Sequence, residues 1–120
     1  MSKIALEHLK KIGVLKQVQE FKWGTPVFII PKKEETVCFL TNFRKVNGLI
    51  VCKPYPIPRI ADALQQLEGF KFATAFDLNM GYYTFLLAEC SKDITAIVTE
   101  FRKFSYKRLP MGIVISSNVF

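Results

Sequence analysis

The stretch KFATAFDLNMGYYTFLLA, residues 71–88, contains a single acidic residue, Asp77, between an apolar run and an aromatic-rich run. The apolar residues before it predict a buried strand over residues 70–76 that ends at Asp77. A carboxylate at the end of a buried strand in a basic protein is a candidate ligand for Mg2+, which prefers hard oxygen ligands. Judged by residue chemistry alone, the favoured alternative is a turn that Asp77 caps through its own side chain.

A second carboxylate does not accompany Asp77 in the sequence. Asp62 falls on a predicted helix, and Glu89 and Asp93 lie beyond a predicted strand of about six residues, which spans roughly 20 Å. Two-metal phosphoryl transfer needs ions about 4 Å apart and therefore more than one anionic ligand. Residues 71–88 alone therefore predict at most half of a metal site.

The rest of the chain predicts an α+β fold from apolar periodicity and from the positions of Gly and Pro. Residues 26–33 and 36–43 predict a hairpin around a basic turn, and the prolines within residues 51–60 exclude a central strand there. The other predicted elements are helices over 3–12 and 59–70, a strand over 83–88, a hairpin of strands over 94–99 and 104–109, and a helix that begins near 116. Because so few residues follow that last helix start, we expect the sequence to be a truncated piece of a longer fold.

The positive charge lies in the first half of the chain. Residues 1–60 carry 11 Lys and Arg against 4 Asp and Glu, residues 61–120 carry 6 of each, and the formal net charge is +7. A one-sided basic surface is typical of proteins that bind a polyanion, and ordinary solubilising lysines are an equally favoured alternative. Three separate cysteines without a C-x-x-C, and the single His8, argue against a zinc cluster and a disulfide framework.

The sequence predicts neither a targeting segment nor a membrane span. The longest aliphatic and aromatic run is VFII, residues 27–30, far below the roughly 18 residues of a spanning helix. The N-terminus, MSKIALEHLKK, lacks the apolar centre of a signal peptide. We therefore expect an intracellular protein without a membrane partner.

Five blocks of sequence together resemble the first half of the reverse transcriptase domain of gypsy-type LTR retrotransposons. The blocks are WGTPVFIIPKK (23–33), FRKVNG (43–48), KPYPIPRI (53–60), LEGFKFATAFDLNMGYY (67–83) and KRLPMG (107–112). The resemblance implies the fingers and a partial palm of a right-hand polymerase fold. Residues 1–69 would be a fingers-like basic region with an N-terminal helix and a helix leading to the palm. Residues 70–120 would be a partial palm that ends before the Tyr-x-Asp-Asp segment of the family.

The resemblance also implies the role of the lone carboxylate. Asp77 matches the first of three catalytic aspartates and would bind Mg2+, and Leu78 would offer its backbone carbonyl to the metal. The other two aspartates belong to the Tyr-x-Asp-Asp segment, which this sequence does not contain. The chain is therefore expected to be catalytically incomplete.

Four further residues match nucleotide-binding positions of the family. Lys32 or Lys33 would contact the phosphates of the nucleotide, and a charged turn is the alternative. Tyr82 would exclude a 2′-hydroxyl on the incoming nucleotide, and a core tyrosine is the alternative. Gly112 would belong to a loop that lies against template and nucleotide.

Other positions are less specific or depart from the family pattern. Arg44 and Asn47 match a block that contacts template and primer or has a structural role. Cys38 stands where the family usually has an arginine that holds triphosphate, and a thiol cannot make that bidentate contact. Residues 115–117, Ile-Ser-Ser, replace an Asn-Ser-Pro or Asn-Ala-Pro turn, which changes the turn chemistry before the last helix. These departures suggest a decayed copy of a mobile element.

The resulting functional hypothesis is a fragment of an RNA-directed DNA polymerase that is inactive alone. Its full-length parent would transfer nucleotides with Mg2+, and its partners would be an RNA or DNA template-primer, deoxynucleotides and the rest of the Pol polyprotein. It would act in the cytoplasm or in a virus-like particle. The alternatives are a non-catalytic nucleic-acid-binding remnant and a relic without function.

Overall fold

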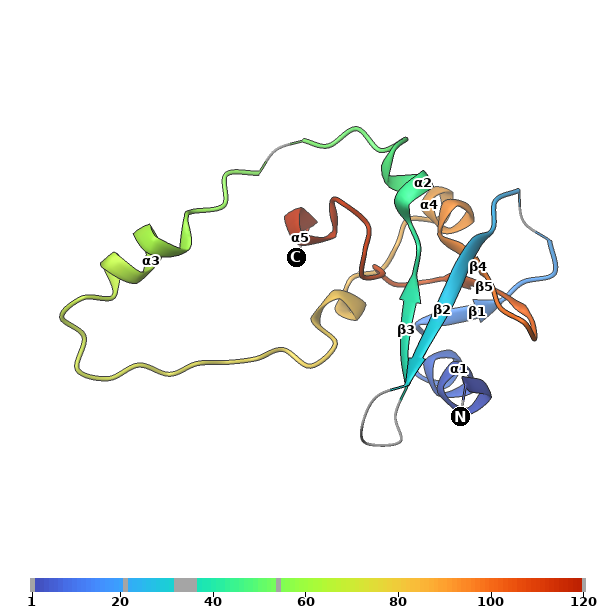
Figure 1. The fold of residues 1–120 in the computed structure, drawn as a ribbon, viewed down its shortest axis with the longest axis horizontal. Coiled ribbons are helices and arrows are strands. Elements are labelled where there is room, and N and C mark those ends of the chain that lie inside the picture. Colours follow the sequence, from blue (N-terminus) through green and yellow to red (C-terminus); the bar gives the residue numbers. More distant parts are fainter. Residues whose placement is uncertain (1, 21, 32–36, 54, 120) are drawn as a thin grey trace.

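A computed structural model describes residues 2–20, 22–31, 37–53 and 55–119, and it divides into two regions (Figure 1). The body comprises the described residues of 2–50 and 81–119 and contains the β-sheet. The arm, residues 51–80, leaves the body after a short helix, runs outward and returns (green to yellow in Figure 1). The radius of gyration is 17.2 Å, whereas a compact chain of this length has about 14 Å. The arm therefore accounts for an extended rather than a compact shape.

Five strands form the sheet of the body, in the order β1-β5-β4-β2-β3. They are β1 (Leu15–Gln17), β2 (Thr25–Pro31), β3 (Val37–Thr41), β4 (Ala96–Val98) and β5 (Lys103–Tyr106). The β2–β3 and β4–β5 pairs are antiparallel, so both predicted hairpins are confirmed. The sheet joins the two halves of the chain, because β2 pairs in parallel with β4 and β1 pairs with β5. The sequence analysis missed β1.

The helices are short, and one of them, α3, lies in the arm away from the sheet (Figure 1). They are α1 (Ser2–Lys11), α2 (Arg44–Asn47), α3 (Ile60–Gln66), η1 (Gly81–Thr84), α4 (Glu89–Lys92), η2 (Asp93–Thr95) and α5 (Ser116–Val119). The helices predicted over 3–12 and from near 116 are confirmed as α1 and α5. The helix predicted over 59–70 is present as the shorter α3. Gly13 ends α1 with a φ of +76°, a left-handed conformation that glycine adopts without a steric penalty. None of the helices in the described part of the chain is both long and apolar enough to cross a membrane.

The hydrophobic core lies entirely in the body. Its buried members are Leu6, Leu9, Val14, Leu15, Phe43, Val46, Ile97, Phe104, Tyr106 and Ile113. Phe43 and Tyr106 pack with their ring centroids 6.2 Å apart and tilted by 56°, a favourable aromatic geometry. The Tyr106 hydroxyl also lies 3.2 Å from the Thr41 hydroxyl, so this buried phenol has a polar partner.

Two strand predictions around Asp77 are wrong. Residues 72–78 have no regular secondary structure, and Phe72 and Phe76 are 91% and 90% exposed. A strand needs a hydrogen-bonded neighbour, and within the described chain no strand lies beside this segment. Asp77 therefore does not follow a buried strand.

The segment predicted as a strand over residues 83–88 also has a different structure. It begins in η1, makes one isolated bridge between Leu86 and Arg108, and leads into α4. Met80, with a φ of +53°, turns the chain into η1. The bridge does not extend into a ladder because η1 ends at Thr84 and α4 begins at Glu89, which leaves few extended residues between them.

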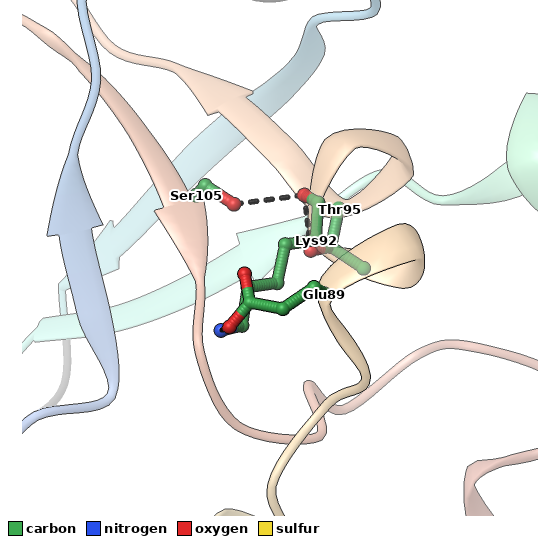
Figure 2. A network of polar contacts seen from close by, with 4 residues as sticks. All are labelled: Glu89, Lys92, Thr95 and Ser105. Carbon is green, nitrogen blue, oxygen red and sulfur yellow. Dashed lines mark hydrogen bonds and ion pairs between the residues drawn. The ribbon is translucent and has the colours of Figure 1, made fainter.

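A polar network fixes the far end of this segment against the sheet (Figure 2). The backbone carbonyl of Lys92 accepts hydrogen bonds from the hydroxyls of Thr95, at 2.9 Å, and Ser105, at 2.8 Å. On the surface, the Lys92 ammonium pairs with the Glu89 carboxylate, which lowers the pKa of Glu89. These contacts attach α4 to β5 and so hold the segment that follows the candidate site.

Candidate functional site

Asp77 lies in an open cleft where the arm rejoins the body. The cleft has a volume of about 330 Å³ and is lined by Phe76, Asp77, Leu78, Met80, Gly81, Tyr82 and Met111. Three of the residues singled out in the sequence, Asp77, Leu78 and Tyr82, are thus together. The left-handed turn at Met80 bends the chain between the first two and Tyr82. It allows residues on both sides of the turn to line one cleft.

The structure does not support the turn-capping alternative for Asp77. The carboxylate is exposed, and it makes no hydrogen bond or ion pair with any described residue. The 3-10 helix that follows also lacks a side-chain cap at its start. An acidic side chain that contributes nothing to the local fold is free to contact a ligand.

The residues present do not by themselves fit a magnesium ion. Within the described part of the chain, no three His, Cys, Asp or Glu residues come together in a way that could hold a metal. Mg2+ demands near-octahedral oxygen coordination and loses its water shell reluctantly, so one carboxylate and one backbone carbonyl do not make a site. Asp77 and Leu78 could supply only part of one.

Tyr82 and its neighbour Tyr83 face different surroundings. Tyr82 lines the cleft, whereas Tyr83 packs against the hydrophobic core. Burial raises the pKa of the Tyr83 phenol, and the nearby Tyr106 raises it further. Arg108 donates to the backbone carbonyl of Tyr83 at 3.1 Å and so holds η1 against the body. Both tyrosines are half-buried, but only Tyr83 packs against the core cluster, so the core-tyrosine alternative for Tyr82 is not what the structure shows.

A second cleft, of about 390 Å³, lies on the other side of the loop 110–114. It is lined by Phe28, Leu40, Thr41, Asn42, Phe43, Arg44, Asn47 and Gly112. Arg44, Asn47 and Gly112 are thus brought together, as a shared site requires. Met111 lines the first cleft and Gly112 the second, so this loop is the wall between them.

The side-chain amide of Asn47 binds that loop through both its nitrogen and its oxygen. Its Nδ2 donates to the carbonyl of Gly112 at 2.9 Å, and its Oδ1 accepts from the amide of Val114, also at 2.9 Å. The contact joins residues 65 positions apart in the sequence. Of the two roles that the sequence left open for Asn47, the structural one is therefore observed.

Gly112 and Ser116 complete the support of the loop. Gly112 has a φ of +92°, and a Cβ there would meet the Phe43 ring at 3.6 Å, an ordinary contact. The backbone conformation, rather than space, therefore favours glycine. The buried Ser116 hydroxyl donates to the carbonyl of Pro110 at 2.9 Å. This role of Ser116, at a position where the sequence departs from the family pattern, was not foreseen.

Three of the predicted positions give less information. Lys32 and Lys33 lie outside the described residues. Cys38 is half-buried on β3, where it pairs in register with Ile30 and lies near Tyr83.

Comparisons with known proteins identify the relatives of the chain. No protein-family model matches it. The Retrovirus-related Pol polyproteins from transposons 412 and gypsy of Drosophila melanogaster are 30% and 34% identical, each over 82% of this chain. The Pro-Pol polyprotein of simian foamy virus type 1 is 28% identical over 98% of it. The homologues of this chain are Pol polyproteins. The chain spans only 8 to 10% of the length of these three relatives.

Solved structures match nearly the whole chain, including the arm. A crystal structure of the prototype foamy virus protease-reverse transcriptase matches 98% of this chain with a TM-score of 0.87 and 28% identity, and the match takes up 16% of that chain. A structure of the foamy viral protease-reverse transcriptase in complex with double-stranded DNA matches with a TM-score of 0.74 and 25% identity. The mixed α/β fold is therefore that of a segment of these proteins.

Proposed function

We propose that the chain is part of the reverse transcriptase domain of a gypsy-type LTR retrotransposon. In this proposal residues 1–69 belong to the fingers and residues 70–120 to the palm of a right-hand polymerase fold. The homology to Pol polyproteins and the fold match to a protease-reverse transcriptase support it. One observation carries it: Asp77, Leu78 and Tyr82 line one cleft with Met111, although the KRLPMG block is far from them in the sequence.

The proposed reaction of the whole enzyme is RNA-directed DNA synthesis, a nucleotidyl transfer in which Mg2+ would stabilise the charge on phosphate oxygens. Asp77 would contribute one carboxylate to the metal, and Leu78 would contribute a backbone carbonyl. The remaining ligands would come from a part of the Pol polyprotein that this chain does not include. Tyr82 would contact the sugar of the incoming nucleotide, because it lines the same cleft as Asp77. The isolated chain would not catalyse the reaction.

The body would contact the template-primer through its basic residues. The excess of Lys and Arg falls within residues 1–60, and a related foamy viral protein has been solved with double-stranded DNA. Contacts of lysine and arginine with phosphates carry no sequence information, so binding would be unspecific and would weaken as salt rises.

A chimera tests the catalytic part of the proposal. This chain would replace the matching segment of the foamy virus protease-reverse transcriptase, and primer extension would be measured with Mg2+ and deoxynucleotides. We expect activity in the chimera and none in the isolated chain. Asp77→Asn should abolish extension, whereas Asp62→Asn, an exposed carboxylate on α3, should leave it unchanged. Equal activity of the two variants would contradict the role of Asp77.

The same chimera tests two finer assignments. Tyr82→Ala should increase ribonucleotide incorporation more than it lowers the rate with deoxynucleotides. Cys38→Arg should lower the KM for deoxynucleotides, because an arginine can form bidentate contacts with phosphate. A Tyr82→Ala variant that loses both substrates equally would assign Tyr82 a packing role only.

Salt-dependent binding of the isolated chain tests the nucleic-acid contact. The affinity for an RNA/DNA duplex would be measured by fluorescence anisotropy at several salt concentrations. Replacing Lys32 and Lys33 with Ala should reduce the slope of log K against log salt by about 2. Replacing Lys71 and Lys103, two exposed lysines of the second half, removes the same charge and should leave the slope nearly unchanged. A salt-independent affinity would contradict the proposal.

A further inference from the structure

The short helix that carries Tyr82 depends on contacts outside itself. Helix η1 has four residues, begins after the left-handed Met80 and has no side-chain cap at its start. The hydrogen bonds of a 3-10 helix have poor geometry, and such a helix rarely extends beyond about four residues. The orientation of Tyr82 is therefore set by the contacts that hold η1 from outside.

Arg108 holds the carbonyl end of this helix. Arg108 is half-buried, and its Nη1 donates to the backbone carbonyls of Tyr83, at 3.1 Å, and Thr84, at 3.4 Å. The last carbonyls of a helix lack partners within it, and a charged donor binds a carbonyl more strongly than a neutral one does. One side chain thus binds the last two carbonyls of η1.

The backbone around Arg108 is fixed without the help of its side chain. The amide of Leu87 donates to the carbonyl of Lys107 at 2.9 Å, and the amide of Leu109 donates to the carbonyl of Phe85 at 3.0 Å. These two bonds lie on either side of Arg108 and involve only backbone atoms. A substitution at Arg108 therefore removes the guanidinium and leaves this pairing in place.

Arg108 also joins the two sides of the cleft at Asp77. Tyr82 lines this cleft from η1, and Met111, three residues after Arg108, lines it from the loop 110–114. The loop is itself held by the Asn47 amide. The Arg108 side chain thus sets the position of Tyr82 relative to a firmly held wall.

A second anchor of η1 determines what the loss of the guanidinium would do. Tyr83 packs against the hydrophobic core, and within η1 the Thr84 hydroxyl donates to the carbonyl of Gly81 at 2.7 Å. These contacts keep the turn formed and attached to the body. Without the guanidinium we expect η1 to tilt about Tyr83, which displaces the adjacent Tyr82 without unfolding the body.

We propose that Arg108 is a positioning residue for sugar selection, which holds Tyr82 where its ring excludes a 2′-hydroxyl on the incoming nucleotide. This inference rests on the proposed function, from which it takes the sugar contact of Tyr82. A ribonucleotide differs from a deoxynucleotide by one oxygen atom, and a displacement of about 1 Å can change a rate about 100-fold, so the excluding wall must be closely fixed. Among the described residues that line the cleft Arg108 is absent, so it acts through Tyr82.

Nucleotide selection by the chimera with the foamy virus protease-reverse transcriptase tests the inference. The kcat/KM would be measured for a ribonucleotide and for the matching deoxynucleotide on one template-primer. Arg108→Leu should raise the ratio of the first value to the second at least about 10-fold, the effect of about one charge-assisted hydrogen bond. Arg102→Leu is the matched control, because this exposed arginine donates to the Gln17 side chain at 3.0 Å rather than to η1. It should leave the ratio unchanged.

Two further variants separate positioning from packing. Tyr82→Ala combined with Arg108→Leu should raise the ratio no further than Tyr82→Ala alone, because Arg108 acts through the ring that is then missing. Arg108→Lys keeps the charge and a donor but loses the planar fork, so its ratio should lie between those of the unchanged chimera and of Arg108→Leu.

Three results would overturn the inference. They are an unchanged ratio in Arg108→Leu, an equal loss of kcat/KM with both nucleotides, and additive effects of Tyr82→Ala and Arg108→Leu. If Arg108→Leu does not fold, an unchanged ratio in Arg108→Lys overturns it instead. If Tyr82→Ala relaxes selection and Arg108→Leu does not, only this inference is rejected. If neither variant relaxes selection, the sugar contact of Tyr82 in the proposed function is rejected as well.

Discussion

The body and the arm have similarly apolar sequences but opposite burial. In the body Phe43 and Ile97 are 2% and 1% exposed, whereas in the arm Phe72 and Phe76 are 91% and 90% exposed. The difference arises because the strands and α1 of the body pack against one another, whereas among the described residues no strand pairs with the arm and no residue of the buried core cluster belongs to it. Apolar periodicity thus indicates which side chains can be buried. The arrangement of the strands and helices determines which of them are buried.

The candidate site draws on both regions. Asp77 and Leu78 come from the arm, and Tyr82 and Met111 come from the body. The wall of the cleft is held firmly, since Asn47 and Ser116 bind the loop 110–114. Among the described residues, no hydrogen bond or ion pair holds the Asp77 carboxylate, so its position depends on the path of the returning arm.

Limited proteolysis should separate the two regions most strongly. Trypsin should cleave after Arg59 and Lys71 at least about 100-fold faster than after Lys16 of β1, because opening the sheet requires several kcal/mol and opening the arm requires little. The rates would be measured by mass spectrometry over time. Similar rates at the three bonds would show that the arm is as well packed as the body.

Truncation of one aromatic ring in each region should have unequal effects on stability. Phe43→Ala should lower the free energy of unfolding by about 3–5 kcal/mol, through lost burial and the cavity left beneath Gly112. Phe72→Ala should change it by less than about 0.5 kcal/mol, as exposed substitutions do. Urea unfolding monitored by circular dichroism measures both. A comparable loss in the Phe72 variant would place that ring in a core.

The same contrast explains how far the sequence predicts the fold. The two hairpins and α1 could be predicted because local periodicity, Gly13 and the turns specify them. The strand over 70–76 could not be judged from its alternation, because its existence depends on a neighbouring strand that the described chain does not provide. Conversely, β1 has only three residues and is fixed by pairing with β5, far along the chain.

The candidate site was predictable to a similar degree. Asp77 and Tyr82 lie five residues apart, so a single turn brings them to one cleft. The contact of the Asn47 amide with Gly112 joins residues 65 positions apart, and no local pattern specifies it. The resemblance to a family identified the candidate residues. The contacts between them could be seen only in the fold.

Removal of the Asn47 amide should loosen the wall between the two clefts. Asn47→Ala should lower the free energy of unfolding by about 1–2 kcal/mol, since it removes two hydrogen bonds to the loop. The amide of Val114 should exchange hydrogen faster in the same variant. Asn79→Ala, which removes an exposed amide of the arm, is the control and should change neither quantity. Unchanged exchange at Val114 would contradict the role of Asn47.

Stability should decrease at high pH because of two phenols of the body. Burial raises the pKa of both Tyr83 and Tyr106 above the ordinary value of 10.0, so the folded state favours the protonated phenols. Their contribution to stability is fully present below pH 10.0 and is lost as pH rises above it, because the unfolded phenols ionise first. The slope should approach about 1.4 kcal/mol per pH unit for each phenol. Tyr83→Phe should make the decline in the urea midpoint shallower, and an unchanged decline would contradict the assignment.

The smallest expected difference lies within the body, between a buried and an exposed contact of α4. Ser105→Ala removes the hydroxyl that donates to the Lys92 carbonyl and should cost about 1 kcal/mol, because a partly buried carbonyl then loses one of its donors (Figure 2). Glu89→Gln removes a surface ion pair with Lys92 and should have no measurable effect, since water and salt screen exposed charges. Urea unfolding at low and at high salt measures both. If the Glu89 variant were the less stable of the two, and only at low salt, electrostatics rather than the buried hydrogen bond would attach α4 to the sheet. The anchoring of the segment after Tyr82 would then depend on ionic strength, and the contrast between a firmly packed body and a loosely held arm would be smaller than the burial of their side chains suggests.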